Sequence, residues 1–115
     1  METLLEKARK KEYAFGLYLS DANPMMTEIA VHAGFDYLRM DTEHSMMDAS
    51  VLKNMIQTAD AFGVPSLVRI ANLSQITQLL DFGVAGILVP DVETREQAQT
   101  LVDLAKFAPI GKRGF

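Results

Sequence analysis

A repeated pattern of helix, glycine, apolar segment and charge constrains the fold of this chain more than any other feature. Three times a predicted helix ends near a glycine, an apolar segment follows, and that segment closes on a charged residue, at Asp41, Arg69 and Asp91. Glycine commonly ends a helix, and short runs of branched and aromatic residues are typical of strands. Strands that alternate with helices predict a parallel sheet with right-handed crossovers. We therefore expect one α/β domain over residues 1–115.

Four strand–helix units are predicted, preceded by an amphipathic N-terminal helix over residues 2–11. The expected strands cover residues 13–20, 36–41, 65–69 and 85–90. The expected helices after them cover residues 24–33, 48–61, 74–83 and 93–107, with Asp48 and Ser74 as N-caps of the second and third.

Four such units fit either a small open doubly wound sheet or half of a (β/α)8 barrel. The chain has no G-x-G-x-x-G or P-loop segment, so the commonest reason for an open sheet is missing. A whole barrel needs ~200–250 residues. The 115 residues of this chain are about half of that number.

The composition excludes several classes of protein. Hydrophobic residues make up 49% of the sequence, which is too many for a disordered chain. No apolar run approaches the ~20 residues of a membrane helix, and the N-terminus lacks the pattern of a signal peptide. The net charge of −4 and the lack of a basic stripe argue against a nucleic-acid partner. Without cysteine no disulfide framework is possible, so a cytoplasmic location is expected.

The segment Asp41-Thr42-Glu43-His44 places acids, a hydroxyl and a histidine where the second predicted strand ends. Ligands bind at the carboxyl ends of parallel strands in α/β proteins. A histidine there can transfer protons near neutral pH, and a nearby carboxylate can fix its tautomer. A loop of solvated polar residues would look the same, so this segment alone leaves both interpretations open.

Seven short segments follow one another in a register that resembles a known family. They are Gly16–Ser20, Ala33–Leu38, Asp41–His44, Val68–Arg69, Gln78–Gly83, Leu88–Pro90 and Pro109–Gly114. Each segment is weak alone, but together they resemble the HpcH/HpaI aldolases, such as 2,4-dihydroxyhept-2-ene-1,7-dioate aldolase. The similarity begins near residue 14 and covers the rest of the chain.

The resemblance implies a (β/α)8 TIM-type barrel, of which this chain would be about half. It also implies a class II aldolase, a carbon–carbon lyase that cleaves or forms 2-oxo acid aldol adducts, with pyruvate as donor and an aldehyde as acceptor. A divalent cation, Mg²⁺ or Mn²⁺, is implied as cofactor. Its direct ligands in the family, a Glu after the fifth strand and an Asp in a later loop, are expected to be absent from this chain. A non-catalytic half-barrel, acting as a structural or interaction module, is the alternative.

The resemblance further implies a role for each polar residue. His44 resembles the proton-transfer base, and Arg69 resembles the arginine that holds the 2-oxo acid and steadies its enolate oxygen. Glu43 resembles an acid that contacts the water shell of the metal. Asp41 could orient His44, or it could simply form a turn. Arg69 could instead be a structural residue paired with Asp91.

Asp81 lies near a predicted helix C-terminus, where a negative charge opposes the helix dipole by roughly 0.3–1 kcal/mol. In the family the matching Asp of Gln-Leu-Leu-Asp-x-Gly raises the basicity of the catalytic histidine. A helix C-terminus lies at the bottom of a barrel, whereas His44 would lie at the top. We therefore expect Asp81 to serve the site of a neighbouring subunit, with a solvated helix end as the alternative.

A half-barrel has open sheet edges and an inner face that needs a cover. Because side chains alternate along a strand, Leu67 should share a face with Arg69, and Ile87 and Val89 should share one with Asp91. The three apolar residues would then line an uncovered inner surface. We therefore expect a homo-oligomer rather than a stable monomer.

Overall fold

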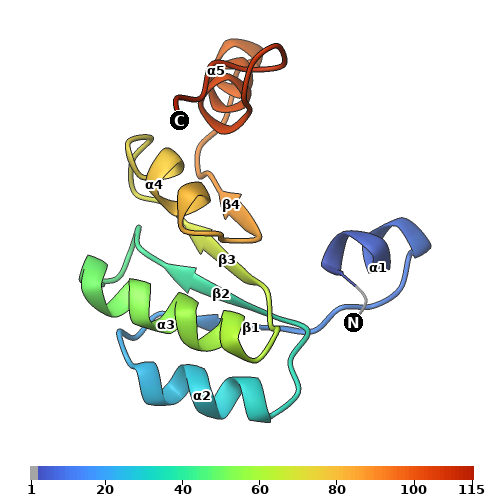
Figure 1. Cartoon of the computed structure of the whole chain (residues 1–115), viewed down its shortest axis with the longest axis vertical. Coiled ribbons are helices and arrows are strands. Elements are labelled where there is room, and N and C mark those ends of the chain that lie inside the picture. Colours follow the sequence, from blue (N-terminus) through green and yellow to red (C-terminus); the bar gives the residue numbers. More distant parts are fainter. Residues whose placement is uncertain (1–2) are drawn as a thin grey trace.

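The computed structural model describes residues 3–115 and has the predicted alternation of strands and helices (Figure 1). The helices are α1 (Leu4–Lys10), α2 (Pro24–His32), α3 (Ala49–Ala61), α4 (Gln75–Asp81) and α5 (Arg95–Ala105). The strands are β1 (Gly16–Leu19), β2 (Tyr37–Asp41), β3 (Ser66–Arg69) and β4 (Gly86–Leu88). Residues 1 and 2, where the first helix was predicted to begin, lie outside the described residues.

The strands form one parallel sheet of four in the order β1-β2-β3-β4. A doubly wound sheet reverses its strand order at a switch point, and this sheet has no reversal. Consecutive parallel neighbours, each pair joined through a helix, are the arrangement of a (β/α)8 barrel. The sheet order therefore favours the half-barrel over the open doubly wound sheet.

Helices cover one face of the sheet, which we call the helix-covered face. Figure 1 shows α2 and α3 side by side along the sheet, with α4 beside the next strands. Leu38, Met40 and Val68 of the strands are fully buried on this side, and they share a hydrophobic cluster with Met55 and Ala59 of α3. This face supplies the core of the described chain.

The other side of the sheet, which we call the open face, carries the polar residues. Tyr18, Arg39 and Leu67 are register neighbours there, on β1, β2 and β3. Asp41 and Arg69 are paired one layer closer to the carboxyl ends of the strands. The open face thus presents two successive rows of side chains. Within the described chain, no helix covers these rows, whereas α2 and α3 cover the opposite side.

The prediction for Ile87 and Val89 is wrong. The register pairs Arg69 with Leu88, so Leu88 lies on the open face and its neighbour Ile87 lies on the helix-covered face. Ile87 and Val89 accordingly pack against the core. The prediction counted the alternation back from Asp91, but β4 ends at Leu88 and Asp91 has a φ of 57°, so the alternation does not extend that far.

The N-caps were predicted in part. Asp48 accepts a hydrogen bond from a backbone N–H of α3, as expected. Ser74 occupies the N-cap position of α4, but its side chain makes no capping hydrogen bond. Its hydroxyl donates to Asn72 instead, and the Gln75 side chain accepts from the backbone N–H of Asn72 at 3.2 Å. The loop before α4 is therefore held by Gln75 rather than by a serine cap.

Helices α1 and α5 differ from the others because neither has a buried residue. In Figure 1, α1 stands apart from the other helices, and α5 lies at the far end beyond α4. An ion pair between Lys7 and Asp36 ties α1 to the start of β2. Leu101 and Leu104 of α5 pack against the edge of the core. Within residues 3–115, no helix has the length and apolar character needed to cross a membrane.

Candidate active site

An ion pair joins β2 and β3 at their carboxyl ends. Asp41 and Arg69 are register partners on the open face. The Nε of Arg69 donates to Oδ1 of Asp41 at 2.9 Å, and its Nη2 donates to Oδ2 at 2.7 Å. This two-point geometry is the strongest form of guanidinium–carboxylate contact. Because Asp41 is fully buried, the arginine is held at a fixed place on the sheet.

Tyr18 completes this contact from β1, and the sequence analysis missed it. Its hydroxyl donates to Oδ2 of Asp41 and accepts from Nη2 of Arg69 at 3.1 Å. In the register Tyr18 is level with Arg39, one layer below Asp41, and its long side chain spans the difference. A tyrosine near the end of the first strand was the available signal, but its partner could not be identified without the register.

The hydrogen bonds keep the pair ionised. Those from Arg69 hold the pKa of Asp41 well below its usual range and outweigh burial, which acts in the opposite direction. Tyr18 and the backbone N–H groups of Glu43 and His44 contribute further to lowering this pKa. The same carboxylate raises the pKa of Arg69 and the pKa of Tyr18. At neutral pH the site therefore holds a carboxylate, a guanidinium and a neutral phenol.

His44 lies beside Glu43 rather than beside the side chain of Asp41. Oε2 of Glu43 is 3.5 Å from Nε2 of His44 and 3.2 Å from Nε of Arg69. The side chain of Asp41 contacts only the backbone N–H of His44, which donates to Oδ1 of Asp41 at 3.5 Å. The His44 side chain is 69% exposed, whereas that of Glu43 is 19% exposed. The acid placed to steady the imidazole is thus Glu43, and the imidazole itself faces solvent.

The loop that carries these residues is tied to the neighbouring strand. Thr42 donates to the carbonyl oxygen of Arg69 through its backbone N–H at 2.9 Å and through its hydroxyl at 2.8 Å. The side-chain amide of Gln75 donates to the Thr42 hydroxyl at 3.2 Å. The Ser45 hydroxyl donates to the carbonyl oxygen of Asp41. These contacts fix the positions of Glu43 and His44 relative to Arg69.

Comparison with known proteins identifies the family of this chain. Residues 14–115 match the HpcH/HpaI aldolase/citrate lyase family. The chain belongs to this family. The resemblance inferred from the seven segments is confirmed, and the match covers both the ion pair and the histidine loop.

Relatives and solved structures agree with this assignment. The hydroxypyruvate/pyruvate aldolase of Cupriavidus necator is 38% identical over 106 residues, which are 90% of this chain and 39% of that protein. The crystal structure of citrate synthase SbnG superposes with a TM-score of 0.91 and 30% identity, over 98% of this chain and 47% of that one. The crystal structure of an HpcH/HpaI aldolase from Desulfitobacterium hafniense DCB-2 superposes with a TM-score of 0.88 and 31% identity, over 100% of this chain and 46% of that one. The chain thus spans about two fifths to one half of the proteins it matches, as expected for about half of a barrel.

The remaining predicted site residues lie away from His44 in this HpcH/HpaI chain. Asp81 ends α4, which runs back toward the start of β4, so it lies at the opposite end of the sheet from the histidine loop. Its side chain is 56% exposed and forms an ion pair with Arg113 of the C-terminal tail. Asp91 is exposed and makes no ion pair within the described chain, and Arg69 pairs with Asp41 instead.

The donor set present does not by itself fit the divalent cation of the family. Among residues 3–115, no group of three or more histidine, aspartate or glutamate side chains is placed to hold a metal ion. Both carboxylate oxygens of Asp41 already accept from Arg69, and one also accepts from Tyr18. Glu43 contacts His44 and Arg69, and its expected contact to a metal-bound water stays a prediction.

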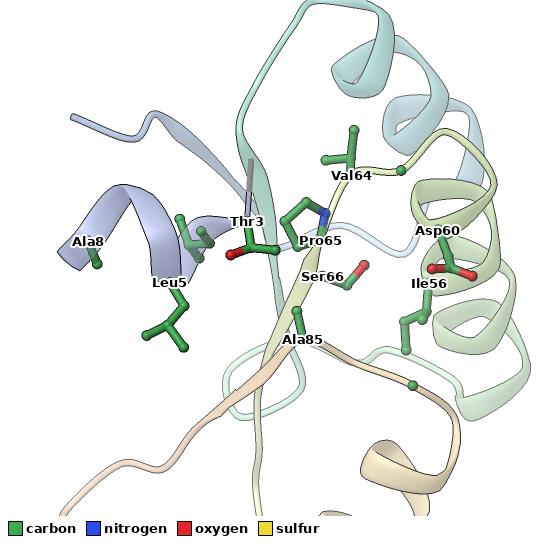
Figure 2. Close-up of a pocket in the computed structure, with 12 residues that line it drawn as sticks. Thr3, Leu5, Ala8, Ile56, Asp60, Val64, Pro65, Ser66 and Ala85 are labelled. Carbon is green, nitrogen blue, oxygen red and sulfur yellow. The ribbon is translucent and has the colours of Figure 1, made fainter. Parts of the chain in front are cut away.

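A large hollow lies at the other end of the strands. It has a volume of about 580 Å³ and is bounded by α1, the end of α3 and the segments leading into β3 and β4. Figure 2 shows Leu5 and Ala8 on one side of it, with Pro65, Ser66 and Ala85 on the strand side. The hollow is mostly apolar and contains none of the residues of the ion pair. The candidate site therefore lies away from this hollow.

Proposed function

We propose that this chain is the substrate-binding half of a cytoplasmic class II aldolase that cleaves or forms 2-oxo acid aldol adducts with pyruvate as donor. The observation that carries the proposal is the fixed guanidinium of Arg69 beside the exposed imidazole of His44. Family membership and the named aldolase relative support the reaction type. Because the chain spans less than half of that relative, the activity is a proposal for the completed barrel.

Arg69 has the hydrogen-bond donors that an enolate needs. A guanidinium has five N–H donors in a rigid plane. Nε and Nη2 are directed to Asp41, Tyr18 and Glu43, whereas neither hydrogen of Nη1 has an acceptor in the described part of the chain. A donor held in place before the reaction stabilises charge that develops on oxygen without reorganisation. Nη1 would therefore bind the carboxylate or the enolate oxygen of the 2-oxo acid.

His44 would move the proton. In aldol cleavage a base removes the proton of the 4-hydroxyl group, the bond between C3 and C4 breaks, and the aldehyde leaves. The electron pair of that bond forms the enolate of pyruvate, which then takes a proton at C3. An imidazole suits both transfers, and Glu43 at 3.5 Å would hold its orientation. Asp41 takes part by fixing Arg69.

We further propose that the divalent cation of the family, Mg²⁺ or Mn²⁺, is held by residues that complete the barrel. Glu43 would then face the water shell of the ion. No step of the proposed proton transfer requires a direct bond from this chain to the cation.

Assembly is part of the same proposal. The open face and the two sheet edges would be covered in a homo-oligomer, and Asp81 would contact the histidine loop of another subunit. Within one chain Asp81 is held by Arg113 at the opposite end of the sheet, so it can reach a histidine loop only across an interface. Sedimentation equilibrium of the 115-residue chain should show self-association at micromolar concentration, and a folded monomer would contradict this part.

The alternative is a half-barrel without catalysis that acts as a structural or interaction module. It is equally compatible with the described residues, which hold no group of three or more metal-ligating side chains. The two functions are separated by joining the chain to the C-terminal half of the Cupriavidus necator aldolase and measuring pyruvate release from 4-hydroxy-2-oxo acids. Release that depends on Arg69 supports the aldolase. A folded hybrid without activity, with the parent aldolase active in parallel, supports the module.

A further inference from the structure

The hollow at the amino ends of the strands is large enough to hold a small molecule. Its volume of about 580 Å³ lies within the usual range of ligand sites. Leu5 and Ala8 of α1 form one wall, and Pro65 and Ala85 lie on the strand side (Figure 2). Because Leu5 is 59% exposed, a molecule in the hollow would remove apolar area from water.

Asp60 is the only charged residue among the described residues that line this hollow. It lies in the last turn of α3, which contains no basic residue, and one helical turn after Ile56, which also lines the hollow. A carboxylate near the C-terminus of a helix opposes the helix dipole, whereas a cation there is favourable. Asp60 is exposed and makes no ion pair or side-chain hydrogen bond within residues 3–115. The hollow thus carries one negative charge that the described chain does not neutralise.

Ser66 adds a hydrogen-bonding group on the strand side of the hollow. It is 4% exposed, and its Oγ has no hydrogen-bond partner in the described chain. Buried hydroxyl groups are normally hydrogen-bonded. Figure 2 shows its oxygen directed toward the side of the hollow where Asp60 and Ile56 lie. A carboxylate and an unpartnered hydroxyl therefore border the same apolar space.

We propose that the hollow binds a small amphipathic amine. Its apolar body would lie against Leu5 and Ile56, and its ammonium group would donate to Asp60 and to the hydroxyl of Ser66. An ammonium group has three N–H donors and supplies the positive charge that Asp60 lacks. The hollow contains none of the residues of the candidate active site, so this inference does not depend on the proposed function.

The lining of the hollow disfavours other classes of ligand. A hydrocarbon would leave both Asp60 and Ser66 without a partner, which is costly for a buried hydroxyl. The charge of Asp60 would repel a carboxylate or a phosphate. A divalent cation needs several oxygen ligands, and no group of three metal-ligating side chains exists within residues 3–115. An amine with an apolar body satisfies both polar groups and covers the apolar wall.

Three ligands with the same apolar body test the proposal on the 115-residue chain. They are 4-phenylbutylamine, 4-phenylbutan-1-ol and 4-phenylbutanoate, which differ mainly in the charge of the end group. An NMR titration of the isotope-labelled chain measures each affinity and shows which backbone amides respond. The signals of Leu5, Ile56 and Ala85 should shift, and those of Thr42 and Glu43 should not.

The affinities should follow the charge of the ligand. The amine should bind about fivefold more tightly than the alcohol, which is the upper end of the scale for a partly exposed ion pair. The carboxylate should bind more weakly than the alcohol, because Asp60 repels it.

Variants of the two polar residues make the result decisive. Asp60→Asn removes the charge with little change of shape, so the preference for the amine should disappear while the affinity for the alcohol stays. Asp91→Asn, at an exposed acid beyond the carboxyl end of β4, is the matched control and should keep the preference. Ser66→Ala should weaken the amine and the alcohol alike by about threefold, the scale of one hydrogen bond.

Four outcomes would contradict this inference. Equal affinities for the amine and the alcohol would overturn it, as would a preference that persists in Asp60→Asn. Signal shifts confined to the histidine loop would overturn the location. If Asp60→Asn leaves amine binding unchanged but weakens self-association in sedimentation equilibrium, Asp60 pairs with a cation of a second copy and the small-molecule site is wrong.

Discussion

The two faces of the sheet differ in how deeply their side chains are buried. On the helix-covered face Leu38, Met40 and Val68 are fully buried. On the open face the register neighbour Tyr18 is 43% exposed, and Arg39 and Leu67 are only partly buried. Parallel sheets are normally covered on both faces. The comparison shows that the core of this chain lies on one face, whereas its candidate site lies on the other.

Substitution of leucine on each face should give the largest contrast. Leu38→Ala removes a fully buried side chain from the core, so it should lower the free energy of unfolding by about 2–5 kcal/mol. Leu67→Ala, from the partly exposed open face, should lower it by less than about 1 kcal/mol. Urea denaturation followed by circular dichroism measures both. Equal losses would break the comparison and show that the open face is already covered in solution.

Loss of the histidine should affect chemistry without affecting stability. In a completed barrel, His44→Ala should slow aldol cleavage by at least ~10²-fold, the usual scale for removing a positioned base. Its side chain is 69% exposed, so the melting temperature should stay unchanged. Met46→Ala, at a fully exposed position of the same loop, is the control and should retain full activity. An activity of His44→Ala within a few-fold of wild type would remove His44 from the mechanism.

The contribution of the buried Asp41 carboxylate to the stability of the chain should depend on pH. Asp41→Asn should cost about 1–3 kcal/mol at pH 7, because Arg69 loses its charged partner. The pKa of Asp41 is lowered on folding, so its stabilisation is complete above the unfolded pKa of ~3.9 and is lost as pH falls through the folded value. The difference between wild type and variant should therefore shrink below about pH 4.

Urea denaturation at neutral and acidic pH measures this difference. Asp91→Asn, at an exposed acid that has no ion pair in the described chain, serves as the control and should show no such trend. A wild-type advantage that persists unchanged in acid would mean that the Asp41 contact does not depend on its charge.

Metal binding should show the smallest effect. The open face offers charge but no group of three metal-ligating side chains within residues 3–115. Isothermal titration of the chain with Mg²⁺ or Mn²⁺ should therefore detect no binding tighter than roughly millimolar, and Glu43→Gln should not change the result. Micromolar binding would contradict this prediction, because it would mean that the open face of this half alone holds a metal centre.

The sequence was sufficient where local rules decide the structure. The glycine-punctuated pattern predicted the strands and their parallel order, and the charges at Asp41 and Arg69 marked the carboxyl ends correctly. Residues whose role depends on strand register were missed. Tyr18 was missed because its contacts with Asp41 and Arg69 depend on how β1 pairs with β2. A tyrosine near the end of an apolar run is a signal, but the sequence does not show which residues it contacts.

Two further residues show the limits of prediction by counting along the chain. The face of Ile87 was assigned from Asp91, although the strand ends before that residue. Asp81 was expected to serve a neighbouring subunit or to be a solvated helix end, and its ion pair with Arg113 of the C-terminal tail, 32 positions away in the sequence, was not predicted. The alternation of side chains along a strand helps to predict which face each residue occupies. A C-terminal tail has no such periodicity, so its long-range contacts cannot be predicted in this way.

Gln75 has a consequence for the motion of the site. Its side-chain Oε1 accepts from the backbone N–H of Ala71 at 2.8 Å, and its side-chain Nε2 donates to the Thr42 hydroxyl at 3.2 Å. One side chain therefore cross-links the loop after β3 to the loop that carries the histidine. The two loops must shift together or break these bonds. In the proposed reaction, an aldehyde that pressed on the loop after β3 would displace the imidazole too, so recognition of the acceptor and alignment of the proposed base would be coupled.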